Sequence, residues 1–555
     1  MPSKKTRVLV IGLDGATFDL ILPYIREGHL PAFKRMVEEG IWGDLESTQP
    51  PMTGPAWSSF MTGKNPGKHG IFDFMMRNPN GYDWITLNAT HRTAPSFWNF
   101  LGAEDKKVVI FNIPVTYPPE KVNGVMVSGF LTPPQAKDFI FPAGVKDRME
   151  KAGVSFAPFY MGENYSLGRE DKFIREIERM TDETIRAIDF LMESEPWDLF
   201  AGVIQTPDIL QHCLWQFEDE NHPSYRENLR VKEVFLNNYK EIDAYIGSVL
   251  KRMDDQTILF IISDHGAGYI EKQFFVNNWL LDEGFLVLKK TTQTFLKKTL
   301  LKTGFTPMRL HKFLVSLGID LSKAIANHRN EFFNNLNRWL LCLQDVDWTS
   351  SKAYAMGNSG FININLKGRE PQGIVEPGRD YHRALDEIIE KLSALKDPHT
   401  GAPLVDRFLK GKEIYHGPLV SRAPDLFMVM KNYSYYARGD YLFNTNQAFG
   451  DLWLQSGSHR SNGILLGKGP GLRRGYNIRG ASIMDIAPTI LGLIGGLIPE
   501  DMDGKVLEAL FTEEKRRGME LHYIPPERNI QKEKILTRSE QEAIRKKLND
   551  LGYLG

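Results

Sequence analysis

The sequence has little cysteine and no long apolar run. Its 555 residues include two cysteines, Cys213 and Cys342, which are too few for a disulfide framework and form no CxxC pair. This usage is typical of a protein in a reducing compartment. No stretch approaches the roughly 18 uninterrupted apolar residues of a membrane span, and the apolar run after Arg7 is too short for a signal-peptide core. We therefore expect a cytoplasmic location and no membrane span.

The chain also lacks an excess of charge of either sign. Lysine and arginine number 68 against 69 aspartate and glutamate residues, so no overall field favours a nucleic-acid polymer or an anionic membrane. Hydrophobic residues make up 42% and charged residues 25%, which is ordinary for a globular chain with a sizeable core. Any anionic substrate is expected to be small and held by local charge.

Two apolar runs end abruptly in polar residues. The run at 257–262 is followed by Asp264 and His265, and the run at 7–13 is followed by Asp14. Runs of this length suit strands that are buried on both faces of a parallel sheet. Ligands bind at the carboxyl ends of such strands, so these three residues are candidate metal ligands. The alternative is a strand-to-turn junction in which Asp264 caps the next element.

The segment at 50–63, PPMTGPAWSSFMTG, places a hydroxyl near the start of a helix. Its prolines favour an extended approach, and Pro55 can open a short helix that ends at Gly63. Thr53 then lies at or just before the helix N-terminus, where backbone N–H groups and the helix dipole favour an anion. Thr53 is therefore a candidate nucleophile toward phosphate, although it would serve equally as a simple helix cap.

Further candidate ligands lie on a helix and in a turn. Thr206 and Pro207 favour a helix start, so Asp208 and His212, four residues apart, project from one face. That spacing suits a metal site as well as a plain ion pair. His459 lies in a glycine- and serine-rich turn before the strand at 464–467. Together these groups supply six ligands, enough for two triads, and two divalent ions about 4 Å apart promote in-line phosphoryl displacement.

Five motifs, in this order, resemble the alkaline phosphatase superfamily and, within it, the type I phosphodiesterase and nucleotide pyrophosphatase group. They are GLDG at 12–15, PPMTGPAWSSFMTGKNPGKHGI at 50–71, TPDILQH at 206–212, SDHGAG at 263–268 and SGSHR at 456–460. The segment from 484 to 507 is similar to the superfamily's closing helix and loop. The resemblance implies an α/β fold: a three-layer sandwich with a mostly parallel central sheet and helices on both faces.

The resemblance also implies a role for each site residue. One metal would be held by Asp208, His212 and His459, and the other by Asp14, Asp264 and His265 together with Thr53. The two divalent ions are commonly zinc in this family, and the same ligands accept manganese. Thr53 would attack phosphorus to form a covalent phospho-threonine, which water would then hydrolyse.

We therefore expect a two-metal hydrolase that cleaves a small phosphodiester, pyrophosphate or phosphomonoester. Two alternatives stay open: a phosphomutase or phosphotransferase related to cofactor-independent phosphoglycerate mutase, and a catalytically inactive binding protein. One position departs from the pattern of nucleotide pyrophosphatases, because Phe74 stands where they carry a phosphate-contacting asparagine. Lys64 and Asn65, close to Thr53 in the sequence, are candidate replacements for that contact.

The domain organisation follows from changes in composition along the chain. We expect a catalytic core from residues 1–290 and 351–510, with residues 138–195 as a candidate cap over the sheet edge. The strand-like segments at 360–366 and 425–430 are expected to continue the core sheet. Residues 291–350 are expected to form a helical insertion whose lysines face solvent, and 511–555 a charged tail with a short helix.

Overall fold

The computed structural model describes residues 6–158, 170–316, 339–357, 359–397, 400–452, 455–527 and 536–550. Its largest element is a ten-stranded sheet in the order β20-β2-β19-β9-β1-β8-β5-β6-β7, with β21 beside β2. These strands are β1 (Arg7–Leu13), β2 (Ile41–Glu46), β5 (Val108–Phe111), β6 (Gly124–Val127), β7 (Ile140–Phe141), β8 (Leu199–Ile204), β9 (Thr257–Ile262), β19 (Asn462–Lys468), β20 (Tyr476–Asn477) and β21 (Ala481–Ser482).

The sheet is mainly parallel, as predicted. β1 pairs in parallel with both β8 and β9, and β5 pairs in parallel with β6 and β8. β19 lies between β9 and β2 and is antiparallel to both. Because β19 runs the opposite way, its beginning lies at the edge where the parallel strands end. That edge therefore collects residues from distant parts of the chain.

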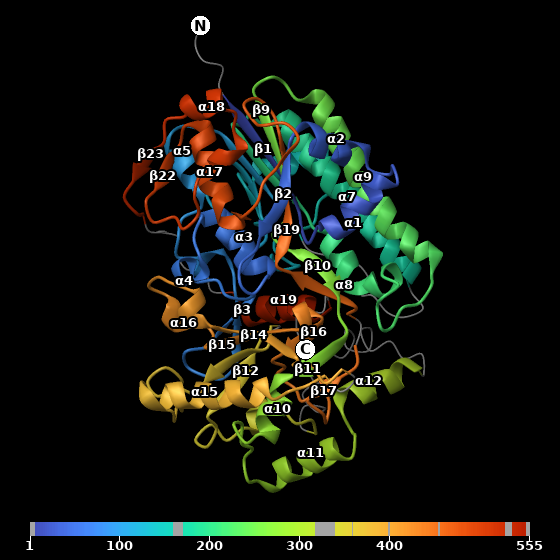
Figure 1. The fold of residues 1–555 in the computed structure, drawn as a ribbon, viewed down its shortest axis with the longest axis vertical. Helices are drawn as coiled ribbons and strands as arrows, with labels where there is room; N and C mark the ends of the chain where they lie inside the picture. Colours follow the sequence, from blue (N-terminus) through green and yellow to red (C-terminus); the bar gives the residue numbers. More distant parts are fainter. Residues whose placement is uncertain are drawn as a thin grey trace.

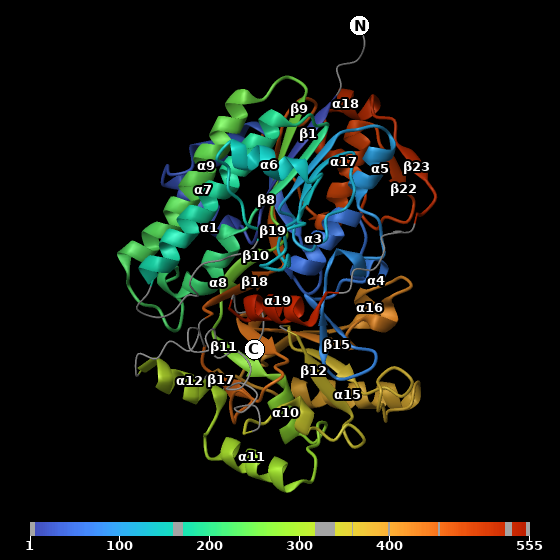
Figure 2. The same ribbon diagram turned by 180° about the vertical axis from the view of Figure 1, so that it is seen from behind.

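Helices cover both faces of the sheet, so the predicted three-layer sandwich is confirmed (Figure 1, Figure 2). Alternate residues of β1 point to opposite faces: Leu9 and Ile11 pack in one core cluster and Val8 and Val10 in another. One face carries α1 (Phe18–Arg26), α2 (Pro31–Glu39), α7 (Glu170–Ser194), α8 (Thr206–Glu218) and α9 (Leu229–Arg252). The other carries α3 (Thr53–Thr62), α5 (Phe97–Ala103) and α17 (Ile486–Ile494).

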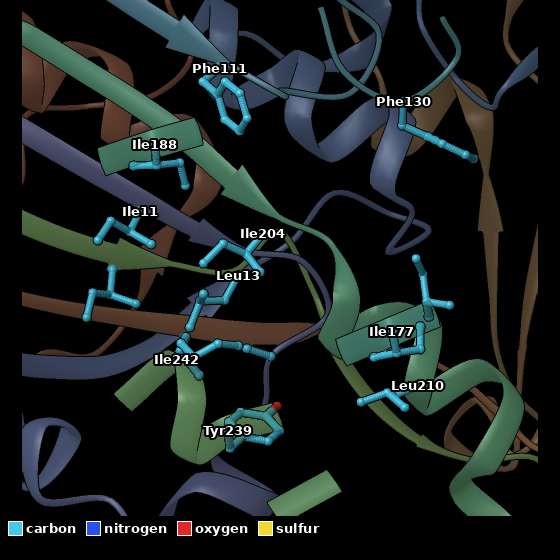
Figure 3. Packing of buried hydrophobic residues seen from close by; sticks show 14 of the residues in the cluster. Ile11, Leu13, Phe111, Phe130, Ile177, Ile188, Ile204, Leu210, Tyr239 and Ile242 are labelled. Atoms are coloured by element: carbon cyan, nitrogen blue, oxygen red, sulfur yellow. The ribbon is translucent and has the colours of Figure 1, made fainter. Parts of the chain in front are cut away.

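The described parts of residues 138–195, expected to form a cap over the sheet edge, pack against or extend the central sheet instead. α7 packs Ile177 and Ile188 into the core on the face of β8, and Figure 3 shows Ile188 beside Ile11 of β1. β7 extends the edge of the central sheet. The apolar stripe of α7 covers the sheet because burying it there removes it from water. The prediction of a cap is wrong for α7 and β7, and residues 159–169 lie outside the described residues.

A second lobe is inserted between β10 (Gly266–Tyr269) and β18 (Gly457–Arg460), which pair with each other (Figure 1). Its sheets are the four-stranded β12-β13-β15-β14 and the three-stranded β16-β11-β17. The strands are β11 (Lys272–Phe275), β12 (Ala353–Met356), β13 (Phe361–Ile364), β14 (Val405–Lys410), β15 (Leu426–Met430), β16 (Tyr435–Arg438) and β17 (Phe449–Gly450). Its helices include α10 (Val276–Asp282), α11 (Thr292–Lys302), α12 (Pro307–Ser316), α15 (Arg379–Ser393) and α16 (Gly411–Ile414).

This lobe corrects the expected domain boundaries. β13 and β15, expected in the central sheet, belong to a separate antiparallel sheet with its own buried cluster, which includes Ile362 and Met428. A continuous apolar run predicts burial on both faces of a strand, but it does not specify which sheet the strand joins. The expected insertion at 291–350 contributes α11 and α12 to the same lobe, and residues 317–338 lie outside the described part.

The tail forms the expected helix, α19 (Arg538–Asp550), and its Ile544 and Leu548 are buried. β23 (His522–Ile524) pairs with β22 (Leu497–Pro499). The remaining short elements are α4 (Pro66–His69), α6 (Gly144–Lys151), α18 (Glu513–Arg517), β3 (Met75–Arg77) and β4 (Trp84–Thr86). Within the described ranges, no helix combines the length and apolar character needed to cross a bilayer.

A glycine in β1 allows α3 to approach the sheet. A Cβ atom at Gly12 would lie 2.4 Å from Cη2 of Trp57, which is fully buried. We predict that Gly12→Ala lowers the free energy of unfolding by about 1–3 kcal/mol through overpacking, measured as a lower melting temperature. Gly202→Ala in the adjacent β8 is the control, since its Cβ would meet nothing closer than 3.3 Å. Equal melting temperatures for the two variants would contradict this packing.

Candidate active site

The structure brings together seven of the nine side chains predicted for the site. Each lies at the carboxyl edge of the central sheet, and none is more than 8% exposed. Asp14 directly follows β1, Asp264 and His265 follow β9, and Thr53 begins α3. Asp208 and His212 lie in the first two turns of α8, and His459 lies in β18.

The pairing of β10 with β18 explains how His459 reaches the other residues. Ala267 stands opposite His459 in this antiparallel pair, so His459 comes next to the segment that carries His265. The two imidazole rings stack with centroids 3.8 Å apart. A two-stranded ribbon therefore joins sequence positions that are almost 200 residues apart.

The ligand atoms fall into the two groups that the sequence predicts. Asp208, His212 and His459 form one triad, and Asp14, Asp264 and His265 form the other, with ligand atoms within 4.8 Å of one another in each. In the first, His212 Nε2 is 2.9 Å from His459 Nε2 and 3.4 Å from Asp208 Oδ1. In the second, His265 Nε2 is 3.3 Å from Asp264 Oδ2 and 3.7 Å from Asp14 Oδ1.

Backbone carbonyls orient all three imidazoles. Nδ1 lies 3.0 Å from the Gly457 oxygen in His212, 3.0 Å from the Gly266 oxygen in His265, and 2.8 Å from the Pro51 oxygen in His459. When Nδ1 donates its proton to a carbonyl, Nε2 of the neutral ring keeps its lone pair. Three lone pairs therefore point into the site.

The electrostatics of the site favour a bound cation. Burial raises the pKa of Asp14 well above its usual value, and repulsion from Asp264 and Asp208 raises it further. Burial also raises the pKa of Asp264 and lowers the pKa of His212 and His459, so the imidazoles stay neutral. Among the described residues, Asp14 Oδ1 and Asp264 Oδ2 are buried without a hydrogen-bond partner. Buried carboxylate oxygens of this kind call for a positive charge.

Thr53 is the first residue of α3 and does not cap it. The residue before it, Met52, is extended, and no side-chain hydrogen bond caps the helix. The Thr53 hydroxyl instead lies 3.1 Å from His265 Nε2. Gly15 brings the first triad close: it has φ +67°, and a Cβ there would lie 2.9 Å from Asp208 Oδ1.

Lys64 and Asn65 are not brought into the site. They follow the last turn of α3, about 15 Å along the helix axis from Thr53. Lys64 Nζ pairs with Asp501 at 2.5 Å, and the backbone and side-chain nitrogens of Asn65 donate to Asp503. Proximity in sequence was misleading because a helix separates its two ends. These contacts give no support to the predicted substrate-binding role of the pair.

Phe74 does not replace Lys64 and Asn65 as a polar contact to phosphate. Phe74 is fully buried, its ring packs edge-on against Phe130, and its Cδ1 atom would lie 3.1 Å from a Cβ at Gly54. The ring thus fills the space beside the start of α3. Phosphate recognition in this chain must come from other groups.

A small cavity of about 30 Å³ adjoins His459 and was missed by the sequence analysis. One wall comes from the chain before Thr53 and from β18; the other comes from the second lobe. Its lining residues are Pro50, Pro51, Met52, Ser359, Phe427, Met428, Met430, Tyr433, Tyr435, Tyr436, Ala437, Ser458 and His459. The aromatic run at 433–436 was the available signal. Tyr433 has φ +65°, a backbone conformation that bulky residues rarely adopt outside functional loops.

Comparison with known proteins identifies the family. The sequence profile of type I phosphodiesterases and nucleotide pyrophosphatases matches residues 8–451. The chain belongs to this family. The predicted resemblance is therefore confirmed, and the chain is a phosphodiesterase-type hydrolase. Of the seven clustered residues, His459 alone lies beyond the matched range.

A solved structure agrees on the fold. Human ectonucleotide pyrophosphatase/phosphodiesterase 5 is 14% identical, with a TM-score of 0.51, over 91% of this chain and 100% of that one. An inactive variant of the murine protein in complex with AMP is 13% identical, with a TM-score of 0.46, over 92% of this chain and 100% of that one. At such identities the likeness concerns the fold alone. No curated protein sequence matches the chain.

The Lys64–Asp501 pair predicts a structural role that can be separated from catalysis. Lys64 is 3% exposed, so Lys64→Met leaves Asp501 without its partner and should lower the free energy of unfolding by roughly 1–3 kcal/mol. The KM for a phosphodiester should stay unchanged. Melting temperature and steady-state kinetics are the measurements. Lys34→Met, at an exposed 3.8 Å pair with Glu38, is the control and should change neither. A raised KM for Lys64→Met would return Lys64 to the substrate site.

Proposed function

We propose that this protein is a two-metal phosphodiesterase that uses Thr53 as its nucleophile. The observation that carries the proposal is the position of the Thr53 hydroxyl, 3.1 Å from a member of one ligand triad that itself adjoins the other. Asp208 Oδ1 lies 4.0 Å from His265 Nε2, so the two triads adjoin and form one cluster of polar side chains. A hydroxyl in that position can reach a phosphorus atom held between them.

The residues present fit two divalent cations. Each triad combines carboxylate oxygen with imidazole nitrogen, a donor set that suits zinc and also accepts manganese. The buried, unpaired oxygens of Asp14 and Asp264 and the converging Nε2 atoms of His212 and His459 support this assignment. Bound there, the cations would supply positive charge that lowers the pKa of the Thr53 hydroxyl and stabilises phosphoryl oxygens.

The first chemical step belongs to Thr53. Its hydroxyl gives its proton to solvent, and its oxygen forms a bond to phosphorus while the bond from phosphorus to the leaving oxygen breaks. The leaving group departs with the electron pair and takes up a proton from water. The start of α3 directs its backbone N–H groups toward the same region, where they stabilise charge on the non-bridging oxygens. Because Phe74 supplies no hydrogen bond, these amides carry the contact that a side-chain amide would otherwise make.

The second step hydrolyses the phospho-threonine and regenerates the free Thr53 hydroxyl. A water oxygen bonds to phosphorus as the bond to Thr53 breaks, and Thr53 recovers its proton. Burial of Thr53, at 1% exposure, shields the ester from unrelated nucleophiles. The product is a phosphomonoester if the substrate was a diester or a pyrophosphate derivative.

The cavity beside His459 supports a small substrate with one apolar group. Met52, Phe427 and Tyr436 present mainly apolar surface there, and none of the described residues that line the cavity is a lysine or arginine. A diester or pyrophosphate with a ring-bearing ester group matches this lining better than a highly charged polymer.

A cytoplasmic location stays a prediction. Both cysteines are free and buried.

We predict that Thr53→Ala abolishes hydrolysis of bis-p-nitrophenyl phosphate by zinc- or manganese-loaded protein, with a loss of at least about a thousandfold in kcat. Thr53→Ser, which retains a hydroxyl, is the matched control and should keep measurable turnover. In acid-quenched wild-type protein, mass spectrometry should find the phosphoryl adduct on the peptide that contains Thr53.

Three results would count against the proposal. Wild-type rates for Thr53→Ala would remove Thr53 as the nucleophile. Faster turnover of p-nitrophenyl phosphate than of the diester would identify a monoesterase. Transfer of the phosphoryl group to a sugar phosphate in preference to water would identify a phosphomutase.

A further inference from the structure

The second lobe ends in a strongly basic segment. From residue 284 to 316 the sequence has six lysines, one arginine and no aspartate or glutamate, although the whole chain is balanced. This segment contains α11, which lies at the end of the molecule opposite the N-terminus in both views (Figure 1, Figure 2). The segment therefore carries a local excess of positive charge, next to the exposed Asp282 and Glu283 that precede it.

The helix α11 buries one charged residue and exposes two apolar ones. Lys297 is buried, at 6% exposure, and its Nζ lies 3.0 Å from both oxygens of Asp345. Phe295 and Leu296 point outward and are 69% and 50% exposed. Rotating the helix to bury the two apolar side chains would break the buried ion pair and leave Asp345 without its partner, which is strongly unfavourable. The Lys297–Asp345 pair thus holds Phe295 and Leu296 in contact with solvent.

Other exposed apolar and basic residues belong to the same part of the lobe. Phe305, just after α11, is 42% exposed. Single exposed apolar residues are normal on a protein surface, but Phe295, Leu296 and Phe305 are all exposed within one basic segment, which marks an interaction site. The exposed basic residues among them are Lys289, Lys290, Lys302, Arg309 and Lys312.

We propose that the tip formed by α11 and the following turn docks onto the surface of an anionic lipid bilayer. Phe295, Leu296 and Phe305 enter the headgroup region, and the surrounding lysines pair with lipid phosphates. This combination of outward apolar side chains and basic residues is the pattern of interfacial membrane helices. The protein would lie on the membrane without crossing it.

The same features disfavour other anionic partners. Non-specific binding to nucleic acid depends on contacts of lysine and arginine with phosphate, and it does not account for the outward position of Phe295 and Leu296. At the tip of the lobe, α11 presents the outer face of a single helix. Such a face fits the broad, deformable surface of a bilayer better than the cleft of a folded protein. The bilayer uses both the charge and the apolar groups.

Vesicle sedimentation tests the proposal on the full chain. We expect wild-type protein to sediment with vesicles of phosphatidylcholine and phosphatidylglycerol, to bind vesicles of phosphatidylcholine alone far less, and to dissociate as salt is raised. Phe295→Ser combined with Leu296→Ser should weaken binding about tenfold, as expected for losing partial burial of two apolar side chains. Lys290→Gln combined with Lys302→Gln should reduce the preference for phosphatidylglycerol.

The control is Leu229→Ser, which removes an equally exposed side chain, 69%, from α9 of the other lobe. It should bind vesicles as wild type does. All variants should keep the wild-type melting temperature and turnover of a soluble diester, because α11 lies far from Thr53. Absence of vesicle binding, or equal binding by wild type and the Phe295/Leu296 variant, would overturn the proposal. So would sedimentation velocity showing that this variant converts a wild-type oligomer into monomers, since the surface would then join copies of the chain.

Discussion

Repulsion among three buried carboxylates is the constraint on which this structure depends. Asp14, Asp208 and Asp264 converge at one edge of a sheet, where burial and repulsion from neighbouring carboxylates raise the pKa of Asp14 and Asp264. A fold tolerates such a cluster when a bound cation offsets the free-energy cost of burying the carboxylates. Burial lowers the pKa of His212 and His459, so these two neutral rings add lone pairs and no charge. The site is therefore pre-organised for cations and, through them, for an anionic group such as phosphate.

The fold meets this constraint by using strand ends. β1, β8 and β9 run in parallel and deliver Asp14, the start of α8 and Asp264 to one edge. β19 runs the other way, so the ribbon that precedes it supplies His459 to the same edge. The second lobe is inserted through this ribbon and closes the cavity beside His459. The proposed site residues thus come from strand ends, helix starts and the ribbon, and one wall of the cavity comes from the inserted lobe.

Local patterns in the sequence predicted the part of the site that depends on local structure. The apolar run at 257–262 had to be a buried strand, and the residues after it had to lie at the sheet edge. The i,i+4 spacing of Asp208 and His212 required only that α8 be a helix. Thr53 at the start of α3 followed from the prolines around it.

Features that depend on long-range pairing were not predictable in this way. β13 and β15 have the apolar composition of central strands, and only their partners reveal a separate sheet. Lys64 is eleven residues from Thr53, but α3 carries it to Asp501. The orientation of α11 depends on Asp345, which lies 48 residues beyond Lys297. In each case the deciding contact joins segments that no local periodicity connects.

Metal content measures the central claim most directly. Native mass spectrometry of zinc-loaded, desalted protein should find two ions per chain. His212→Gln and Asp264→Asn, which remove one ligand from different triads, should each leave one tightly bound ion. Failure of the wild-type protein to retain any ion, or two retained ions in both variants, would contradict the assignment of these residues to two metal sites.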